Sequence, residues 1–451
     1  MQKTIAAIST PAGIGGIAVI RVSGTDSIKI ADRIFRGKDK LQNAQTHTVH
    51  YGHIIDEKKK VIDEVLVSVM RAPRTFTRED VVEISTHGGI TASRTVLDAL
   101  IRAGASLAEP GEFTKRAFLN GRIDLSQAEA VIDIIHSQTQ LAQENAMSQL
   151  SGGLSAKINE IRQTLVSLAA GMQVGIDYPD EDLEDVTIEE IESVCLSCRQ
   201  EVDTLLSTAD SGTILRDGLL TVIAGRPNVG KSSLLNALSM QERAIVTEIA
   251  GTTRDAIEEL VNLDGVPLRL LDTAGIRATE DVVEKIGVQK SQQYIDSADL
   301  ILVVLDAQDG IGREDEEILV STKEKKRIVL VNKTDISTPD ISLDGEETVI
   351  TISAKTGEGI DTLRQTIKRM YRLGAVGQSN GQIITNLRHK QALVEAQESL
   401  THALDAISLG LEQDLVSMDI AEAIDALGKI TGATVSEDIV NAIFHDFCVG
   451  K

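Results

Sequence analysis

The chain has few of the residues that mark several classes of protein. Its 451 residues include 3 Cys, no Trp, 4 Tyr and 6 Phe. Three cysteines exclude a disulfide scaffold and are typical of a reducing compartment. So few aromatic rings exclude a surface that binds single-stranded nucleic acid mainly by base stacking.

Long apolar runs are also missing. No run approaches the roughly 18–20 residues that a membrane-spanning helix needs. The uncharged segment 4–20 is interrupted by Ser9, Thr10 and Pro11, which do not fit a secretory signal. We therefore expect a cytoplasmic protein with no membrane segment.

Positive charge is scarce overall but unevenly distributed. The net charge is −23, yet residues 1–120 hold 17 Lys+Arg against 13 Asp+Glu. A chain with this mean charge is not drawn to nucleic acid as a whole. If RNA is the substrate, a local patch or a partner protein must hold it.

The length and the change of texture along the chain predict several domains. A single core rarely exceeds about 250–300 residues. Residues 1–120 mix strands and helices, 121–215 and 379–451 are helical in texture, and 216–378 alternate short strands with helices. The expected fold is multidomain: an N-terminal α+β domain, a helical domain in two separated segments, and an inserted doubly wound, Ras-like α/β domain. Its strands are predicted at 219–224, 268–271, 300–305, 328–331 and 349–352.

The inserted domain begins with a phosphate-binding motif. Residues 225–232 read Gly-Arg-Pro-Asn-Val-Gly-Lys-Ser and fit the P-loop pattern, between an apolar strand and a helical run. Backbone N–H groups of such a loop bind phosphate oxygens. Lys231 is expected to reach the β- and γ-phosphates, and the Ser232 hydroxyl to bind Mg²⁺.

Three further motifs follow predicted strands and favour GTP over ATP. They begin at Asp272 (Asp-Thr-Ala-Gly), Asn332 (Asn-Lys-Thr-Asp) and Ser353 (Ser-Ala-Lys). Asp335 can accept hydrogen bonds from both N1–H and the exocyclic amine of guanine. The order and spacing resemble translation-factor-type GTPases. The residues predicted to bind GTP are Asn228, Val229, Gly230, Lys231, Ser232, Ser233, Thr247, Glu248, Ile249, Ala250, Gly251, Thr252, Thr253, Asp272, Thr273, Ala274, Gly275, Asn332, Lys333, Asp335, Ser353, Ala354 and Lys355.

This sequence lacks the usual residue that orients the attacking water in GTP hydrolysis. Ras-like GTPases have a Gln after the glycine of the Asp-Thr-Ala-Gly motif, but this chain has Ile276, which cannot orient water. Residues 247–255 supply two adjacent threonines where a switch loop should cover the γ-phosphate. Of the two, Thr253 is the predicted second Mg²⁺ ligand.

All three regions resemble one family. The GTPase motifs occur with 10–16 (TPAGIGG), 86–89 (THGG), 110–120 (PGEFTKRAFLN) and a terminal FCVGK. With them the sequence resembles the MnmE (TrmE) family of bacterial tRNA-modification GTPases, of the TrmE-Era-EngA type. The resemblance implies a tetrahydrofolate-binding and dimerising domain at 1–120. It also implies a helical domain at 121–215 and 379–451, and a GTPase domain at 216–378.

The resemblance also assigns roles to individual residues. It implies potassium ligands at Asn228, Thr247, Ile249 and Thr252, where K⁺ supplies charge as an arginine finger does elsewhere. Glu284 is implied as the residue that positions water, the role vacated by Ile276. The implied folate-binding residues are Arg21, Glu83, Arg122 and Lys451.

The chemistry on tRNA rests on the resemblance alone. It implies a homodimer that forms a heterotetramer with the flavin-dependent MnmG (GidA). Together they install a 5-carboxymethylaminomethyl-type group on the wobble uridine of certain tRNAs, with 5,10-methylene- or 5-formyltetrahydrofolate as the folate. Cys448 either takes part in this chemistry or only packs. Cys195 and Cys198 are interpreted as ordinary helix residues, because one such pair supplies two of the four ligands of a zinc site.

Two alternatives remain open from sequence. One is a ribosome-assembly GTPase of the Era or Der type, which would lack the folate-like domain and the Cys-x-Gly-Lys end. The other is a folate-dependent scaffold for which GTP is only a switch.

Overall fold

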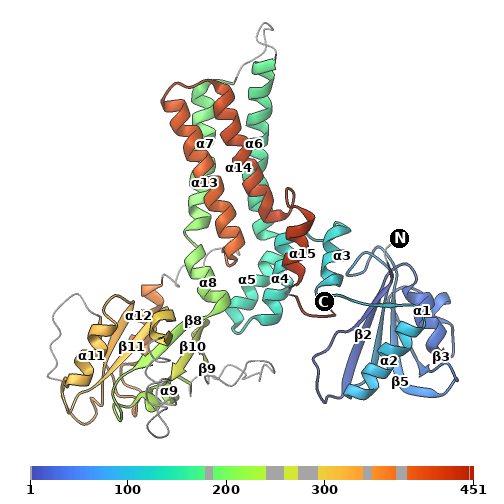
Figure 1. Cartoon of the computed structure of the whole chain (residues 1–451), viewed down its shortest axis with the longest axis horizontal. Helices are drawn as coiled ribbons and strands as arrows, with labels where there is room; N and C mark the ends of the chain where they lie inside the picture. The colour runs from blue at the N-terminus through green and yellow to red at the C-terminus, as the bar shows by residue number, and fades with distance from the viewer. Residues whose placement is uncertain are drawn as a thin grey trace. The chain divides into compact units, whose positions relative to one another are not determined.

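The computed structural model describes residues 3–177, 186–239, 258–272, 293–338, 348–371, 383–445 and 447–450. The chain forms two compact units, residues 1–132 with 425–451, and residues 133–424 (Figure 1). Among the helices of the described ranges, none is long and apolar enough to cross a membrane.

The first unit contains a seven-stranded sheet in the order β3-β4-β5-β6-β2-β1-β7. Every pair in it is antiparallel except β1 with β7. Its elements are β1 (Ile5–Ile8), β2 (Ile17–Ser23), α1 (Ser27–Ile34), β3 (Phe35–Gly37), the 3₁₀ helix η1 (Leu41–Asn43), β4 (Thr48–Ile55), β5 (Val61–Met70), β6 (Val81–His87), α2 (Ile90–Arg102), β7 (Ser106–Leu107), α3 (Glu112–Leu119) and α15 (Glu437–His445).

Alternation along the central strands separates the two faces of this sheet. Ile20 and Val22 on β2 and Ile84 on β6 are buried in one core with residues of α1 and α2. The intervening positions Arg21 and Glu83 lie directly opposite each other on the other face. The strand pattern therefore keeps this charged pair outside the apolar core.

A smaller core joins distant segments of the same unit. Ala117 of α3 and Leu125 pack with Phe444 of α15 and with Phe447. The Phe444 and Phe447 rings lie 5.0 Å apart between centroids. The C-terminal residues are thus held next to the N-terminal sheet, where the Ser9 hydroxyl donates to the Gly450 carbonyl at 3.0 Å.

The second unit contains a six-stranded sheet in the order β13-β12-β11-β8-β10-β9. All pairs are parallel except β9 with β10. The elements are β8 (Leu219–Ala224), α9 (Lys231–Ser239), β9 (Glu258–Leu263), β10 (Val266–Asp272), β11 (Leu300–Asp306), α11 (Arg313–Ser321), β12 (Arg327–Asn332), β13 (Val349–Thr351) and α12 (Ile360–Met370).

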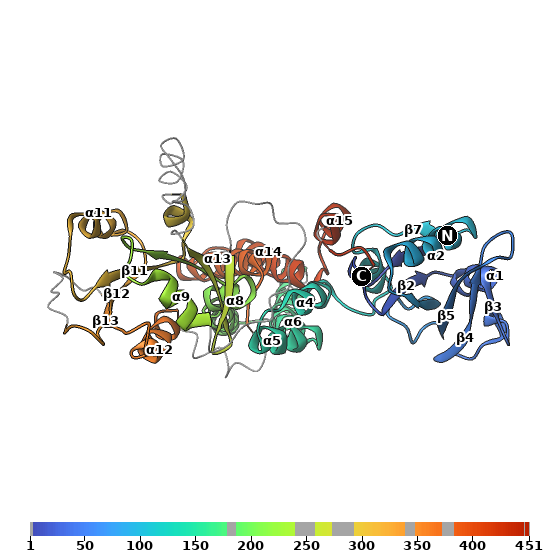
Figure 2. The same cartoon turned by 90° about the horizontal axis from the view of Figure 1, so that it is seen from below.

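Helices cover both faces of this sheet, as Figure 2 shows. Apolar residues of α9 and α12 pack on one face, and Ile318 and Leu319 of α11 on the other. All seven residues of β11 are buried, which is expected of a central parallel strand covered on both sides. The predicted doubly wound fold is confirmed. The antiparallel strand β9 was missed, because residues 258–263 mix acidic and apolar residues.

The rest of the second unit is helical. α6, α7 and α13 run side by side (Figure 1). The helices are α5 (Gln140–Leu150), α6 (Gly153–Asp177), α7 (Ile188–Leu206), α8 (Ala209–Asp217) and α13 (Leu387–Ser408); α4 (Leu125–His136) and α14 (Gln413–Thr431) cross from one unit to the other.

The α/β domain leaves and re-enters this helical part at one place. The Thr208 hydroxyl, just before α8, accepts from the Ile384 N–H at 3.1 Å. The Ser211 hydroxyl donates to the Tyr371 carbonyl at 3.0 Å. A Cβ added at Gly212 would lie 2.1 Å from the Ile384 oxygen, so glycine permits this close approach.

Candidate functional site

The P-loop connects the end of β8 to the start of α9. A Cβ at Gly225 would lie 2.5 Å from the Val304 carbonyl oxygen of β11. Gly230 has φ +101°, and a Cβ there would lie 2.2 Å from Nδ2 of Asn332. Both positions therefore require glycine, and the loop lies tightly against β11 and the end of β12.

The basic residues of the loop are fixed by its own backbone and by the segment after β11. The buried Lys231 ammonium donates to the carbonyls of Gly225 and Arg226, at 2.7 and 2.8 Å. The Arg226 guanidinium lies 3.2 Å from Asp315 and 3.3 Å from Asp309. This anchoring role of Arg226 was not predicted from the sequence. Ser232 and Ser233, in the first turn of α9, are exposed, where helix N–H groups attract anions.

Asn332 joins two predicted nucleotide-binding loops. Its Nδ2 donates to the Val229 carbonyl of the P-loop at 2.8 Å. Its Oδ1 accepts from the Ala354 N–H at 2.9 Å. The amide is buried and uses both of its ends, so the P-loop and the 353–355 loop are held together through one side chain.

Two more pairs fix the same edge of the sheet. The Ser353 hydroxyl donates to Oδ1 of Asp335 at 2.7 Å, and the Asp335 side chain stays exposed. Lys333 lies 2.6 Å from Oδ2 of Asp306. Burial raises the pKa of Asp306, but hydrogen bonds from Lys333 and from the Gln308 backbone outweigh it, so its pKa lies below the usual value. The exposed Asp335 carboxylate is thus oriented by Ser353.

Several predicted residues lie outside the described residues. They are Thr247, Glu248, Ile249, Ala250, Gly251, Thr252, Thr253, Thr273, Ala274, Gly275, Glu284 and Lys451. Asp272 ends β10, and its backbone pairs in register with Ile223 of β8. The motif that begins there therefore starts at the strand neighbouring the P-loop strand.

The first unit contains the residues predicted to bind folate. The Arg21 guanidinium pairs with Oε1 of Glu83 through Nε at 2.9 Å and Nη2 at 2.8 Å. Its carbon lies 5.7 Å from the ring centroids of both Phe76 and Phe113. The guanidinium carbon of Arg122 lies 4.8 Å from the centroid of the same Phe76 ring. Arg122 also donates to the Phe76 carbonyl at 3.1 Å.

Phe76, which stands between two of the predicted folate-binding residues, was not predicted from the sequence. Arg21 and Arg122 both lie within cation–π distance of its ring. A signal was present, since Phe76 is an isolated aromatic residue among Arg71, Arg74 and Arg78. Aromatic residues are rare in this chain, so one inside a basic segment is informative.

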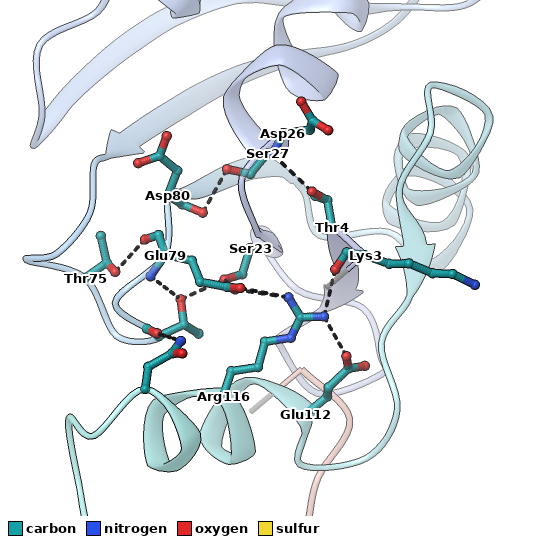
Figure 3. Close-up of polar contacts among 12 residues, drawn as sticks. Lys3, Thr4, Ser23, Asp26, Ser27, Thr75, Glu79, Asp80, Glu112 and Arg116 are labelled. Carbon is teal, nitrogen blue, oxygen red and sulfur yellow. Dashed lines mark hydrogen bonds and ion pairs between the residues drawn. The ribbon is translucent and has the colours of Figure 1, made fainter. Parts of the chain in front are cut away.

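A buried network positions the loop that carries Phe76 (Figure 3). Arg116 donates to both oxygens of Glu79, at 3.2 and 3.1 Å, and to Glu112 at 2.7 Å. The Ser23 hydroxyl donates to Glu79 at 2.7 Å and lies 2.7 Å from the Thr77 hydroxyl. These contacts tie Thr77 and Glu79, which follow Phe76 in the loop, to β2 and α3.

The cysteines fall into two kinds. Cys195 and Cys198 are buried in α7. Burial is the main cause that raises the pKa of Cys195 to about 12 and that of Cys198 to about 11. Both therefore stay protonated and unreactive near neutral pH. Cys448 is exposed, and its carbonyl accepts from the Gly111 N–H at 3.3 Å. Within the ranges that the structure describes, no group of three or more His, Cys, Asp or Glu residues could hold a metal ion.

Comparisons with known proteins match both units. Residues 4–122 match the family described as "GTP-binding protein TrmE N-terminus", and residues 125–448 match "MnmE helical domain". A tRNA modification GTPase MnmE of Listeria innocua is 51% identical over 454 residues, covering 99% of each chain. One of Acetivibrio thermocellus is 48% identical over 457 residues, covering 100% of this chain and 99% of that protein.

Solved structures that resemble parts of the chain include Era and the G domain of FeoB. Aquifex aeolicus Era bound to GDP and aluminium fluoride is 28% identical, covers 40% of this chain and 66% of its own, and has a TM-score of 0.27. The G domain of the FeoB iron transporter of T. maritima is 25% identical, covers 34% and 98%, and has a TM-score of 0.26. Similarity at this level adds nothing to the geometry above.

Proposed function

Because this chain belongs to the MnmE family of tRNA modification GTPases, we propose that its GTP hydrolysis drives modification of the wobble uridine of certain tRNAs to the 5-carboxymethylaminomethyl form. It acts in the cytoplasm, as a homodimer, in a heterotetramer with the flavin-dependent MnmG. The folate domain spans 1–120, the helical domain 121–215 and 379–451, and the GTPase domain 216–378. The match over both units sets aside the ribosome-assembly alternative.

The double hydrogen bond of Asn332 is the observation that carries the nucleotide part of the proposal. It joins the P-loop, the proposed phosphate-binding loop, to the 353–355 loop. Ser353 of that loop contacts Asp335, the residue proposed to recognise the base. Two loops held together by one buried amide can bind both ends of one nucleotide. The Asp335 carboxylate accepts from the guanine edge, a pair of donors that adenine does not offer.

The exposed groups at the P-loop fit the two cations of the proposal. Ser232 presents a hydroxyl next to Lys231 and the start of α9, and hydroxyl and phosphate oxygens suit Mg²⁺. Asn228 is exposed in the loop with φ +65°, and its amide oxygen suits K⁺. Thr253 would complete the Mg²⁺ site; Thr247, Ile249 and Thr252 would complete the K⁺ site. The cations supply positive charge at the phosphates, and Glu284 positions the attacking water.

The Arg21–Glu83 pair and the Phe76 ring support folate binding. A pterin presents a donor edge like that of guanine, so Glu83 can accept from it. Arg21 and Arg122 lie beside Phe76 and can bind the carboxylates of the glutamate part. The C-terminal segment reaches this place, because Arg21 donates to the Gly450 carbonyl at 3.4 Å. Lys451 and Cys448 are proposed to act there, Cys448 in the chemistry on tRNA. The folate is 5,10-methylene- or 5-formyltetrahydrofolate.

Exposed apolar side chains on the first unit support the homodimer. Val49 and Tyr51 of β4 and Leu66 of β5 are 63%, 61% and 48% exposed. Opposite pairs on these strands place Tyr51 against Leu66 on one sheet face. A second copy would remove them from water.

A nucleoside digest of tRNA tests the proposal. In a strain that lacks this gene, the modified wobble uridine should be absent, and the wild-type gene should restore it. A gene carrying Cys448→Ala should restore GTP hydrolysis but not the nucleoside. Unchanged tRNA in the deletion strain would reject the tRNA part. A Cys448→Ala gene that restores the nucleoside would favour a folate-dependent switch without chemistry at Cys448.

A further inference from the structure

The loop between β5 and β6 uses its carboxylates internally but not all of its arginines. Glu79 is bound by Arg116 and Ser23, as Figure 3 shows. Asp80 accepts from the Ala72 N–H at 2.9 Å. Arg71 donates to the carbonyls of Ala44 and Gln42. The acidic groups of the loop are therefore not available to its remaining cations.

Three arginines are left around one concavity of about 470 Å³. Arg74, Arg78 and Arg122 line it together with Met70, Pro73, Thr75 and Phe76. All three arginines are exposed, and none forms an ion pair with a described residue. Arg78 and Arg122 each donate to a backbone carbonyl, of Asn120 at 2.9 Å and of Phe76. Burial and the charge of Arg78 lower the pKa of Arg122, so these cations crowd each other.

This concavity and the proposed folate site share one ring, that of Phe76. Phe76 lines the concavity and also lies 5.7 Å from the Arg21 guanidinium, which pairs with Glu83. A ligand whose ring system lies at Glu83 would therefore extend past Arg21 and Phe76 towards the three arginines.

We propose that this concavity binds the carboxylates of an oligo-γ-glutamate tail, so that the site takes its folate in the polyglutamate form. The inference rests on the folate binding proposed above. A single glutamate carries two carboxylates, whereas three cations without acidic partners suit a ligand with more. Each added glutamyl group brings one further carboxylate for Arg74 and Arg78.

The surroundings favour a short polycarboxylate over an RNA backbone. RNA contacts need a row of cations along several phosphates, but the other lining residues here are neutral. The cations are clustered in one hollow, and the whole chain carries a net charge of −23. The planar guanidinium groups of these arginines can each donate two hydrogen bonds to a carboxylate. The guanidinium of Arg122 is also positioned by its contact with the Phe76 ring.

Titration of the full-length protein with 5-formyltetrahydrofolate as monoglutamate and as triglutamate tests the proposal. The triglutamate should bind about threefold to tenfold more tightly at low ionic strength, the range of two added exposed charge pairs. The gain should shrink in high salt. In Arg74→Gln/Arg78→Gln the gain should disappear while the monoglutamate affinity stays near that of the wild type.

Arg94→Gln is the matched control, because Arg94 is an exposed arginine on α2 of the same unit; it should keep the full gain. Arg74→Gln alone serves if the double variant does not fold, since Arg74 has no hydrogen bond or ion pair to a described residue. Equal affinity for the two folates, or a gain that survives in the variants, would overturn the inference and leave the folate site intact. Loss of tRNA binding in the variants with an unchanged folate preference would overturn it in favour of RNA. Failure of both folates to bind would instead reject the proposed function.

Discussion

At the scale of single residues, the nucleotide site depends on side chains that connect loops. Asn332 uses its amide N–H and its carbonyl on two different loops. Asp335 is oriented by Ser353, whose own Oγ accepts from the Thr356 N–H at 3.2 Å. Such residues fix loop geometry before any ligand binds, which reduces the entropy cost of binding.

Replacing Asn332 by alanine should weaken both the fold and nucleotide binding. The change leaves the Val229 carbonyl and the Ala354 N–H without their partner, at a cost of about 1–3 kcal/mol for each buried group. Denaturant unfolding and GTP titration measure the two effects. Asn236→Ala, at an exposed position of α9, is the control. An Asn332→Ala protein with wild-type stability would contradict the bridging role.

Asp335→Asn should change the preferred base from guanine to xanthine. The asparagine oxygen can keep the hydrogen bond from Ser353, which leaves an NH₂ donor where the second carboxylate oxygen was. That donor repels the guanine amine and suits the xanthine carbonyl. GTP affinity should fall roughly ten- to a hundredfold. Competition between GTP and XTP measures the preference, with the exposed Glu324→Gln as a charge-matched control. A variant that still prefers GTP would show that Asp335 does not read the base.

At the scale of elements, α8 and the returning segment at 383–384 form the connection between the two parts of the second unit. Gly212 lies under the Ile384 carbonyl, and Leu215 packs with Ile383. Gly212→Ala should therefore push the two segments apart and destabilise the unit by about 1–3 kcal/mol, the usual cost of overpacking. Thr213→Ala, on the exposed side of the same helix, should be nearly neutral. Thermal unfolding distinguishes them, and equal stability of the two variants would contradict the close packing.

The elements that could be predicted from sequence are those with a strong local signal. The strand at 300–305 is continuously apolar. The P-loop has glycines at the fixed positions of its motif, and a side chain at Gly225 or Gly230 would clash with neighbouring atoms. The strand β9 was not predicted, because residues 258–263 become a strand through their pairing with β10 and carry no clear strand pattern of their own. The Arg116 network could not be predicted, since its partners are as far apart in sequence as Lys3 and Arg116. Sequence gives residue types, but contacts of this range depend on the tertiary fold.

At the scale of the whole molecule, hydrolysis is expected to depend on K⁺ between two GTPase domains. Asn228 is exposed on the P-loop, so a cation held there can contact the phosphates. Turnover should be fast in potassium chloride and slow in sodium chloride. Asn228→Lys, which brings its own charge, should remove the difference. Phosphate release measured in both salts checks this. Equal wild-type rates would reject the potassium loop.

The connection between the α/β domain and the helical part at Thr208 and Ile384 also has a consequence for folding kinetics. About 180 residues separate the end of α7 from the start of α13, which pack side by side. If the inserted domain folds first and the Thr208–Ile384 hydrogen bond forms with it, the effective loop between the two helices shrinks to a few residues. Loop-closure entropy then falls by about 2–3 kcal/mol. A core substitution such as Leu302→Ala in β11 should therefore slow assembly of the α7–α13 pair, which it does not touch. Stopped-flow refolding with a probe on α13 would show an unchanged rate if the helices pair independently.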